Sequence, residues 1–344
     1  RKWWPACPSR AWRLFPGGMT ARASHAGTTS GAQAYAAVAQ WVSQELQQPV
    51  QPEITTFVRK ILNGANPLGV LFYGSGLRGG VDADTLLDFY IVVDKQRDWP
   101  RSWLSAACNA VLPPNVEYHE YQQGAHTMRA KVAVLSLAQF RQLTGQQTYD
   151  TTVWARFSQP ARLVWVRNEV AAQAVSACVA RACVTAARWA ALLGPQQGQA
   201  RRFWDTLYRQ TYGAELRVER QGRPQSLVEK DPGRYESLLL PCWQAAGIDW
   251  SAQGDVISPA LSVSDRAKGQ KRWALCKALG RPLNMIRLLK AAYTFTGAAR
   301  YAAWKVQRHS GLEITVTPFA EKHPLLAAPP VLWSLWRRGA FTRH

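Results

Sequence analysis

The feature that most constrains the fold is a pair of apolar runs separated by a glycine-rich turn. Residues 68–73 read LGVLFY and residues 86–94 read LLDFYIVVD, and the segment between them begins Gly-Ser-Gly and is otherwise mostly polar. Short apolar runs rich in β-branched and aromatic residues, bounded by turn residues, are typical of buried strands. We therefore predict two buried strands on either side of a turn at this point of the chain.

The remaining pattern predicts strands interleaved with helices up to about residue 167, and mostly helix after it. Alternating or apolar runs predict three further strands, and apolar residues at helical spacing predict the helices. A Gly-Arg-Pro sequence at 280–282 and Gly297 predict two breaks in the last helical block. The predicted strands are 116–121, 131–136 and 161–167, and the predicted helices are 31–46, 54–63, 102–111, 168–193, 198–212 and 266–309 with its breaks.

This order of elements predicts an α+β protein in four parts. Residues 1–30 form an N-terminal extension, 31–167 a domain with a mixed sheet and helices, 168–260 a helical domain, and 261–344 a basic helical C-terminal region. The extension contains arginines and no acidic residue, as organelle presequences do. Translation upstream of a start at Met19, or a disordered tail, explains the same composition.

The positive charge is concentrated at the two ends of the chain. The 344 residues carry 42 Lys and Arg against 22 Asp and Glu, a net charge of +20, and residues 266–344 hold fifteen basic and two acidic residues. Such ends attract nucleic acid, an anionic lipid surface or a polyphosphate substrate. Sixteen tryptophans fit a membrane interface, although they also fit a protein core with a solvated basic face. The tail places Trp333 and Trp336 beside Arg337 and Arg338, which predicts contact with anionic headgroups.

Two classes of protein are disfavoured by composition. No stretch of about 18 apolar residues is free of charge, which argues against a membrane-spanning helix. The six cysteines include no C-x-x-C pair, which argues against a zinc site and against a disulfide-stapled secreted domain.

The residues that carry chemistry lie at the glycine-rich turn and in the strand that follows it. Gly74, Ser75 and Gly76 allow backbone N–H groups to approach phosphate oxygens closely, and Ser75 adds a hydroxyl donor. Asp88 in the following strand can hold Mg²⁺ that bridges a triphosphate. This layout resembles the nucleotidyltransferase superfamily, although a hairpin turn with an acidic residue at a strand edge is also common.

A second metal-binding carboxylate is not identified by the sequence. Nucleotidyltransferases usually carry a second acid two residues after the first, and here that position is Tyr90. Asp94 shares the strand face of Asp88 but lies roughly 20 Å along the strand. The alternatives are Glu117 and Glu120 in the next predicted strand, or Asp82 and Asp84 in the turn.

Several segments in order resemble one branch of that superfamily, the mitochondrial-type phosphatidate cytidylyltransferases, and in particular its bacterial members. They are YGSGL with LLDFYIVVD, where the family also lacks an acid two residues after the aspartate, then AKVAVLS, ARFSQPARLVW, SVSDRAKGQKRW and the C-terminal segments. The resemblance covers about residues 40–344. In SVSDRAKGQKRW, Asp265 and Ala267 replace residues that the family pattern expects.

The resemblance implies a nucleotidyltransferase-fold domain followed by a winged-helix-like helical domain. It implies the reaction of CTP with phosphatidate to give CDP-diacylglycerol and pyrophosphate, with Mg²⁺ as cofactor, in phospholipid and cardiolipin synthesis. The residues it assigns are Asp88, Lys131 and Lys268 as catalytic, Tyr73, Gly74, Ser75, Gly76 and Arg156 as ligands of the CTP phosphates, and Arg266 with Lys268 at the lipid phosphate.

The same resemblance implies a peripheral protein on the cytoplasmic face of a bacterial inner membrane, or on the matrix face of the mitochondrial inner membrane. Nucleic acid is not an expected partner. Two alternatives stay open: a nucleotidyltransferase that extends RNA ends, and a non-catalytic basic scaffold on membranes or nucleic acid. The first lacks a recognisable RNA-binding module in this sequence.

Overall fold

The computed structural model describes residues 30–79, 85–123, 126–214, 227–310 and 315–322, and it is an α+β protein built around a five-stranded mixed sheet. The strand order is β3-β4-β2-β1-β5, in which β2 and β4 run parallel and the other neighbours are antiparallel. All five strands predicted in residues 68–167 are present. Their bounds are β1 (Gly69–Tyr73), β2 (Leu86–Val93), β3 (Asn115–Gln123), β4 (His126–Ser136) and β5 (Ala161–Val166).

Both faces of the sheet are covered, which explains why the central strands read as continuous apolar runs. In β2, Leu87 and Phe89 pack into one cluster with helix α2 (Pro52–Leu62), whereas Tyr90 and Val92 face a second cluster with the long helix α7 (Glu169–Leu193). We call these two sides the α2 face and the α7 face. The helices of the sheet region are α1 (Gly31–Leu46), α2 (Pro52–Leu62), α3 (Ser75–Gly79), the 3₁₀ turn η1 (Gln96–Asp98), α4 (Trp103–Val111), α5 (Leu137–Leu143) and α6 (Thr152–Phe157).

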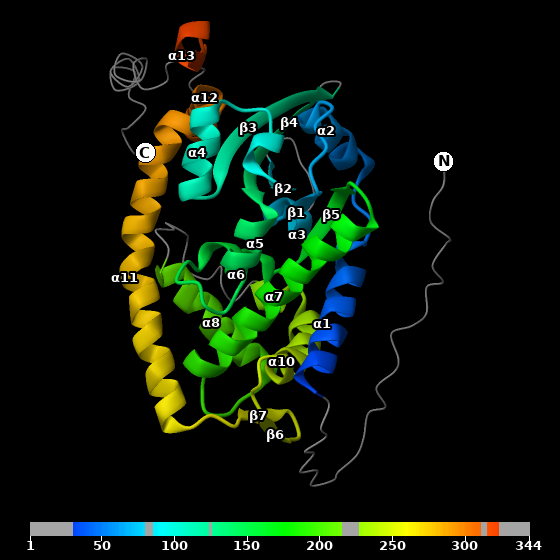
Figure 1. Cartoon of the computed structure of the whole chain (residues 1–344), viewed down its shortest axis with the longest axis vertical. Helices are drawn as coiled ribbons and strands as arrows, with labels where there is room; N and C mark the ends of the chain where they lie inside the picture. Colours follow the sequence, from blue (N-terminus) through cyan, green and yellow to red (C-terminus); the bar gives the residue numbers. More distant parts are fainter. Residues whose placement is uncertain (1–29, 80–84, 124–125, 215–226, 311–314, 323–344) are drawn as a thin grey trace.

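The helical part shares one core with the sheet. Helix α7 (Glu169–Leu193) is rich in alanine, so neighbouring backbones can approach it closely, and its buried residues join the same cluster as β1 and β2. Helix α1 packs mainly against α7 and α10, although it precedes the sheet in sequence. Figure 1 shows the other elements of this part below the sheet: α8 (Ala200–Ala214), α10 (Pro232–Ala245) and the hairpin β6 (Trp250–Gln253) and β7 (Val256–Pro259).

Helix α7 is the one helix in the described residues that is long and apolar enough to cross a membrane. Of its most apolar window, 67% is buried inside the protein. Burial of this extent is what the central helix of a folded core shows, so length and composition alone do not make α7 a membrane span.

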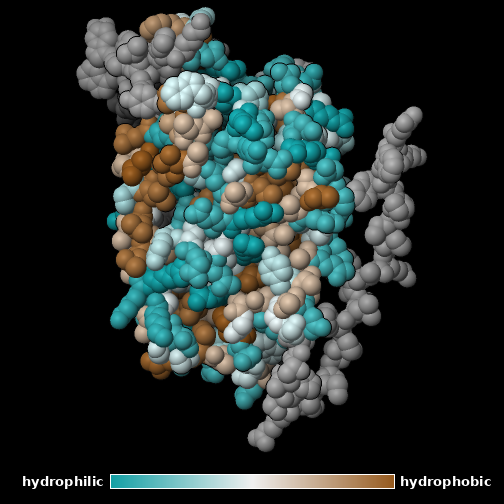
Figure 2. Space-filling model, viewed as in Figure 1, coloured by the Kyte–Doolittle hydropathy of each residue, from teal (hydrophilic) through white to brown (hydrophobic). Residues whose placement is uncertain are grey.

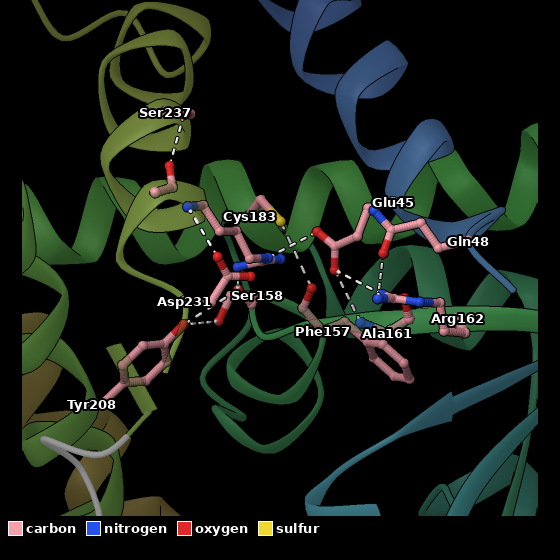
Figure 3. A network of polar contacts seen from close by, with 12 residues as sticks. Glu45, Gln48, Phe157, Ser158, Ala161, Arg162, Cys183, Tyr208, Asp231 and Ser237 are labelled. Atoms are coloured by element: carbon pink, nitrogen blue, oxygen red, sulfur yellow. Dashed lines mark hydrogen bonds and ion pairs between the residues drawn. The ribbon is translucent and has the colours of Figure 1, made fainter. Parts of the chain in front are cut away.

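A buried ion pair ties the helical part to the sheet (Figure 3). Glu45 on α1 accepts hydrogen bonds from Arg234 on α10, at 2.8 Å, and from the backbone N–H of Ala161 at the start of β5, at 3.1 Å. Arg234 also donates to the carbonyl oxygen of Ser158 at 2.7 Å. Figure 3 labels Glu45, Ser158 and Ala161, which lie together at the segment between α6 and β5. Each charge is therefore paired, as burial requires.

The C-terminal region is dominated by one long helix, α11 (Val263–Thr294), which flanks the molecule from the β6–β7 hairpin to the sheet (Figure 1). The predicted break at Gly280-Arg281-Pro282 is wrong, because α11 continues through it. Contacts on both sides of Pro282, through Trp273 and Arg287, hold the two halves in line. The break at Gly297 is confirmed, with a positive φ of 79° before α12 (Ala298–Ser310), and α13 (Pro318–Lys322) follows.

Candidate functional site

A row of polar and aromatic side chains crosses the sheet on its α7 face. In the strand register, Tyr73 of β1 pairs with Asp88 of β2, Asp88 pairs with Lys131 of β4, and Lys131 pairs with Tyr118 of β3. Directly paired residues on neighbouring strands point to the same face of a sheet. Tyr90 and Val92, which alternate with the α2-face residues of β2, identify that face as the α7 face. Three of the predicted site residues, Tyr73, Asp88 and Lys131, are thus brought side by side.

The glycine-rich turn lies directly against Asp88. Gly74 has a φ of 92°, which side-chain-bearing residues rarely adopt, and a Cβ at this position would lie 2.8 Å from Oδ2 of Asp88. A glycine is therefore required both by the backbone conformation and by the approach of the carboxylate. Gly74 and Asp88 are far apart in the sequence, and the antiparallel pairing of β1 and β2 brings them together in space.

The turn itself differs from the expected loop, because it opens directly into the short helix α3. Ser75 is the first residue of α3 and is exposed, and Gly76 is buried. A Cβ at Gly76 would lie 3.0 Å from the side chain of Leu87, so this glycine lets α3 pack on β2. The three turn residues serve different purposes: Gly74 admits the carboxylate, Ser75 faces outward, and Gly76 seats the helix.

Arg156 reaches the same face from helix α6. Its Nη1 donates a hydrogen bond to the hydroxyl of Tyr90 at 3.0 Å, and its guanidinium carbon lies 5.9 Å from the ring centre of Tyr73. Phe157, the next residue, packs against both tyrosine rings. The predicted phosphate ligand Arg156 therefore lies beside the row. The site also includes Tyr90, which the sequence could have indicated because it alternates onto the face of Asp88.

Glu117 and Asp94 do not share a site with Asp88. Glu117 pairs with Val132 and lies on the α2 face, where Trp99 donates to it at 2.8 Å and Arg101 forms an ion pair with it. Burial alone would raise the pKa of Glu117, but hydrogen bonds from His119 and Arg101 outweigh burial and hold the pKa below its usual value. Asp94 follows the far end of β2.

Glu120 shares the α7 face but lies on the outermost strand. It pairs with Arg129, lies 3.5 Å from the guanidinium of that residue, and accepts a hydrogen bond from the Tyr118 hydroxyl at 2.8 Å. Asp82 and Asp84 fall outside the described residues. Within the part of the chain that the structure describes, no three His, Cys, Asp or Glu side chains form a group that could hold a metal. Among the candidate carboxylates in the described residues, Asp88 is the one that lies against Gly74.

Arg266 and Lys268 lie at the other end of the molecule. Arg266 donates to the carbonyl oxygens of Gly194 and Pro195, at 2.9 and 3.1 Å, and so binds carbonyls at the C-terminal end of α7. Lys268, two residues later on α11, is exposed. Figure 1 places this end of α11 near the β6–β7 hairpin and away from the sheet. The described arrangement therefore does not bring either residue to the row, and Trp333, Trp336, Arg337 and Arg338 lie outside the described residues.

No family model matches this chain, and no curated protein matches it either. The residues gathered on the α7 face are therefore the observation that bears on function.

Proposed function

We propose that the chain is a nucleotidyltransferase, and specifically a phosphatidate cytidylyltransferase that converts CTP and phosphatidate to CDP-diacylglycerol and pyrophosphate. The observation that carries the proposal is the contact of Gly74 with Asp88 in a row that also holds Lys131. A glycine turn against a carboxylate, with two cations beside it, is an arrangement suited to a nucleoside triphosphate and its metal. The five-stranded mixed sheet with helices is compatible with a nucleotidyltransferase fold.

The residues present fit a magnesium ion. Mg²⁺ is usually held by one or two carboxylates together with substrate phosphates, so the single carboxylate of Asp88 at the turn is a sufficient protein ligand. Bound there, the ion would neutralise charge on the triphosphate. Backbone N–H groups of Gly74, Ser75 and Gly76 would hold the phosphates, since glycines allow close approach.

The reaction requires positioning and charge neutralisation more than covalent participation by the protein. An oxygen of the lipid phosphate forms a bond to the α-phosphorus of CTP, the bond from that phosphorus to the bridging β-phosphate oxygen breaks, and pyrophosphate leaves. Lys131, paired in register with Asp88, and Arg156, held by Tyr90, would offset the charge on the phosphates. Arg266 and Lys268 have no part in this mechanism, because they lie at the other end of α11.

The proposed partners are CTP, phosphatidate and an anionic membrane surface, and nucleic acid is not among them. A peripheral position on the cytoplasmic face of a bacterial inner membrane accords with a lipid substrate and a net charge of +20. The matrix face of the mitochondrial inner membrane is the alternative location.

The test is turnover by the purified chain with labelled CTP, phosphatidate in mixed micelles and Mg²⁺. We expect lipid-soluble label from the wild type and none above background from Asp88→Asn. The matched control is Asp94→Asn, because this aspartate pairs with Arg167 at 2.7 Å at the far end of β2 and should keep activity.

Two outcomes would redirect the proposal. Label transferred to added RNA but not to phosphatidate would favour the enzyme that extends RNA ends. A folded protein that transfers label to neither acceptor, and whose binding of CTP with Mg²⁺ is absent, would favour the non-catalytic scaffold.

A further inference from the structure

Toward the C-terminal end of helix α11, Arg287 and Lys290 face the protein and large apolar side chains face outward. Arg287 donates to the carbonyl oxygen of Pro113 at 2.9 Å and forms an ion pair with Asp150, which is buried. One turn later, Lys290 donates to the carbonyl oxygens of Leu112 and Pro114 at 2.5 and 2.8 Å. A surface helix of a water-soluble protein usually places its apolar stripe against the core and its charges in solvent. The C-terminal half of α11 does the reverse.

Large apolar side chains fill the outward side of this half-helix. Ile286 and Leu289 are 54% and 62% exposed, and Leu275 and Leu279 continue their stripe toward the start of the helix at 51% and 48%. Leu288, on the other flank of the exposed surface, is 63% exposed. Figure 2 shows hydrophobic surface running along the edge of the molecule where Figure 1 places α11. These positions are too closely spaced to be the scattered apolar residues that any protein surface carries.

Helix α4 extends this surface. The hydrogen bonds of Lys290 to Leu112 and Pro114 hold the C-terminal end of α4 beside α11. Val111, at that end, is 86% exposed, and Trp103 and Leu104 on the first turn of α4 are 80% and 55% exposed. We name the combined surface the α4–α11 face and define it by Trp103, Leu104, Val111, Ile286, Leu288 and Leu289.

The charges around the face select its occupant. Lys277 and Arg281 are exposed between Leu275 and Ile286, Lys271 is exposed one turn earlier, and the one acidic residue on α11 is Asp265 in its first turn. A second copy of the chain would bring the same cations to the face. The chain's own residues 323–344 include three arginines and no acidic residue. An anionic lipid surface offers apolar depth together with the opposite charge.

We propose that the α4–α11 face is a membrane-docking surface that lies in the interface of an anionic bilayer, with its apolar side chains below the headgroups and Lys277 and Arg281 at the phosphates. Trp103 is suited to such a position, since its ring is amphipathic. This surface is distinct from the tryptophan-rich tail, and it does not depend on the proposed reaction.

The experiment is co-sedimentation of the full chain with vesicles, without CTP or phosphatidate. Vesicles of phosphatidylcholine with phosphatidylserine should bind the wild type, and vesicles of phosphatidylcholine alone should bind it more weakly. The double variant Ile286→Glu/Leu289→Glu should lower the partition coefficient by about tenfold or more, because two apolar anchors become anions. The matched control, Val170→Glu/Val256→Glu, makes the same charge change at two exposed valines of α7 and β7 and should bind like the wild type.

All four substituted positions are exposed, so both variants should melt within a few degrees of the wild type. Equal loss of binding in the two variants would overturn the proposal, because general charge would then explain it. Unchanged binding of Ile286→Glu/Leu289→Glu would overturn it as well. A lipid-free dimer by light scattering that dissociates only in Ile286→Glu/Leu289→Glu would assign the face to a second copy instead.

Discussion

Two clusters of charged residues lie on the α7 face of the sheet, and they differ in how far water reaches them. Glu45 and Arg234 are 8% and 4% exposed, and their hydrogen bonds go to each other and to the backbone of the α6–β5 segment. Asp88, Lys131 and Arg156 are half-buried. The two clusters meet at Ala161, whose N–H binds Glu45 and which pairs with Tyr73 across β1 and β5.

The difference separates a structural role from a binding role. A fully buried pair cannot exchange its partner for a ligand without unfolding its surroundings, so the Glu45–Arg234 pair fixes how the helices dock on the sheet. A half-buried cluster at a turn can meet a dissolved ligand. Substitutions in the first cluster should therefore change stability, and substitutions in the second should change activity.

The largest effect is expected from breaking the buried pair. Arg234→Met leaves the Glu45 carboxylate buried without its cation at 2.8 Å, and should lower the free energy of unfolding by about 3–5 kcal/mol in urea titrations. The control is Arg201→Met, which breaks the exposed pair with Glu236 at 3.2 Å and should cost under about 1 kcal/mol.

The double variant Glu45→Gln/Arg234→Met locates the cause. If the unpaired charge is responsible, the double variant should be more stable than Arg234→Met, because no buried charge remains. Equal stability of the two variants would show that lost packing of the arginine dominates. The claim that the charges of the Glu45–Arg234 pair fix the docking of the helices would then be wrong.

Next in size is the effect of a methyl group at the turn. Gly74→Ala combines a φ of 92° with a Cβ 2.8 Å from Asp88, so it should shift the carboxylate and lower turnover on the order of 10²-fold. Gly64→Ala has the same kind of strain, with a φ of 84°, and nothing within 4 Å of its Cβ. Both should lose about 1–2 kcal/mol of stability, measured by thermal unfolding, and only Gly74→Ala should lose activity. Equal activities would mean that Asp88 is not at the reacting centre.

The sequence predicted the sheet well for a physical reason. Strands covered on both faces are apolar at nearly every position, so residues 69–73 and 86–93, in which Asp88 is the exception, stood out without any knowledge of their neighbours. The proximity of Gly74 to Asp88 followed from the pairing of those strands. The α3 helix was missed because its glycines give a turn signal that packing on Leu87 overrides.

Long-range contacts account for what the sequence could not predict. Arg266 binds carbonyls at the end of α7, 72 residues earlier in the chain, and no local pattern distinguishes such an arginine from a phosphate ligand. The same holds for α11, where Arg287 and Lys290 are three residues apart and so share one side of the helix, but the local sequence does not say which side faces the core. Asp150 and the Pro113 carbonyl, which receive Arg287, lie far away in sequence.

A smaller effect is expected at the edge of the binding cluster. Arg156→Lys keeps the charge but loses the planar guanidinium that lies over Tyr73 and donates to Tyr90. We expect KM for CTP to rise about tenfold with kcat nearly unchanged, since a point charge binds phosphate less specifically. Tyr90→Phe removes only the acceptor and should give a rise in KM of less than about threefold, worth one hydrogen bond at most. A loss confined to kcat in Arg156→Lys would place this arginine at the transition state instead.

The smallest predicted effect is a dependence on pH at Lys290, a cation that belongs to neither cluster. Burial, reinforced by the nearby charge of Arg287, lowers the pKa of Lys290 to about 8. An unfolded lysine has a pKa of about 10.4, so the folded state holds fewer protons on this residue between those two values, and its contribution to stability rises with pH across that window. Below about pH 8 the buried ammonium opposes folding, although its hydrogen bonds to Leu112 and Pro114 offset part of that cost.

Lys290→Met removes both effects. The melting temperature of the wild type should therefore rise relative to that of the variant as pH increases from about 7 to about 10. The control is Lys277→Met, which removes an exposed ammonium from the same helix and should melt close to the wild type. A gap between wild type and Lys290→Met that does not change with pH would mean that the Lys290 ammonium is solvated, and the inward orientation of the basic side of α11 would then be in error.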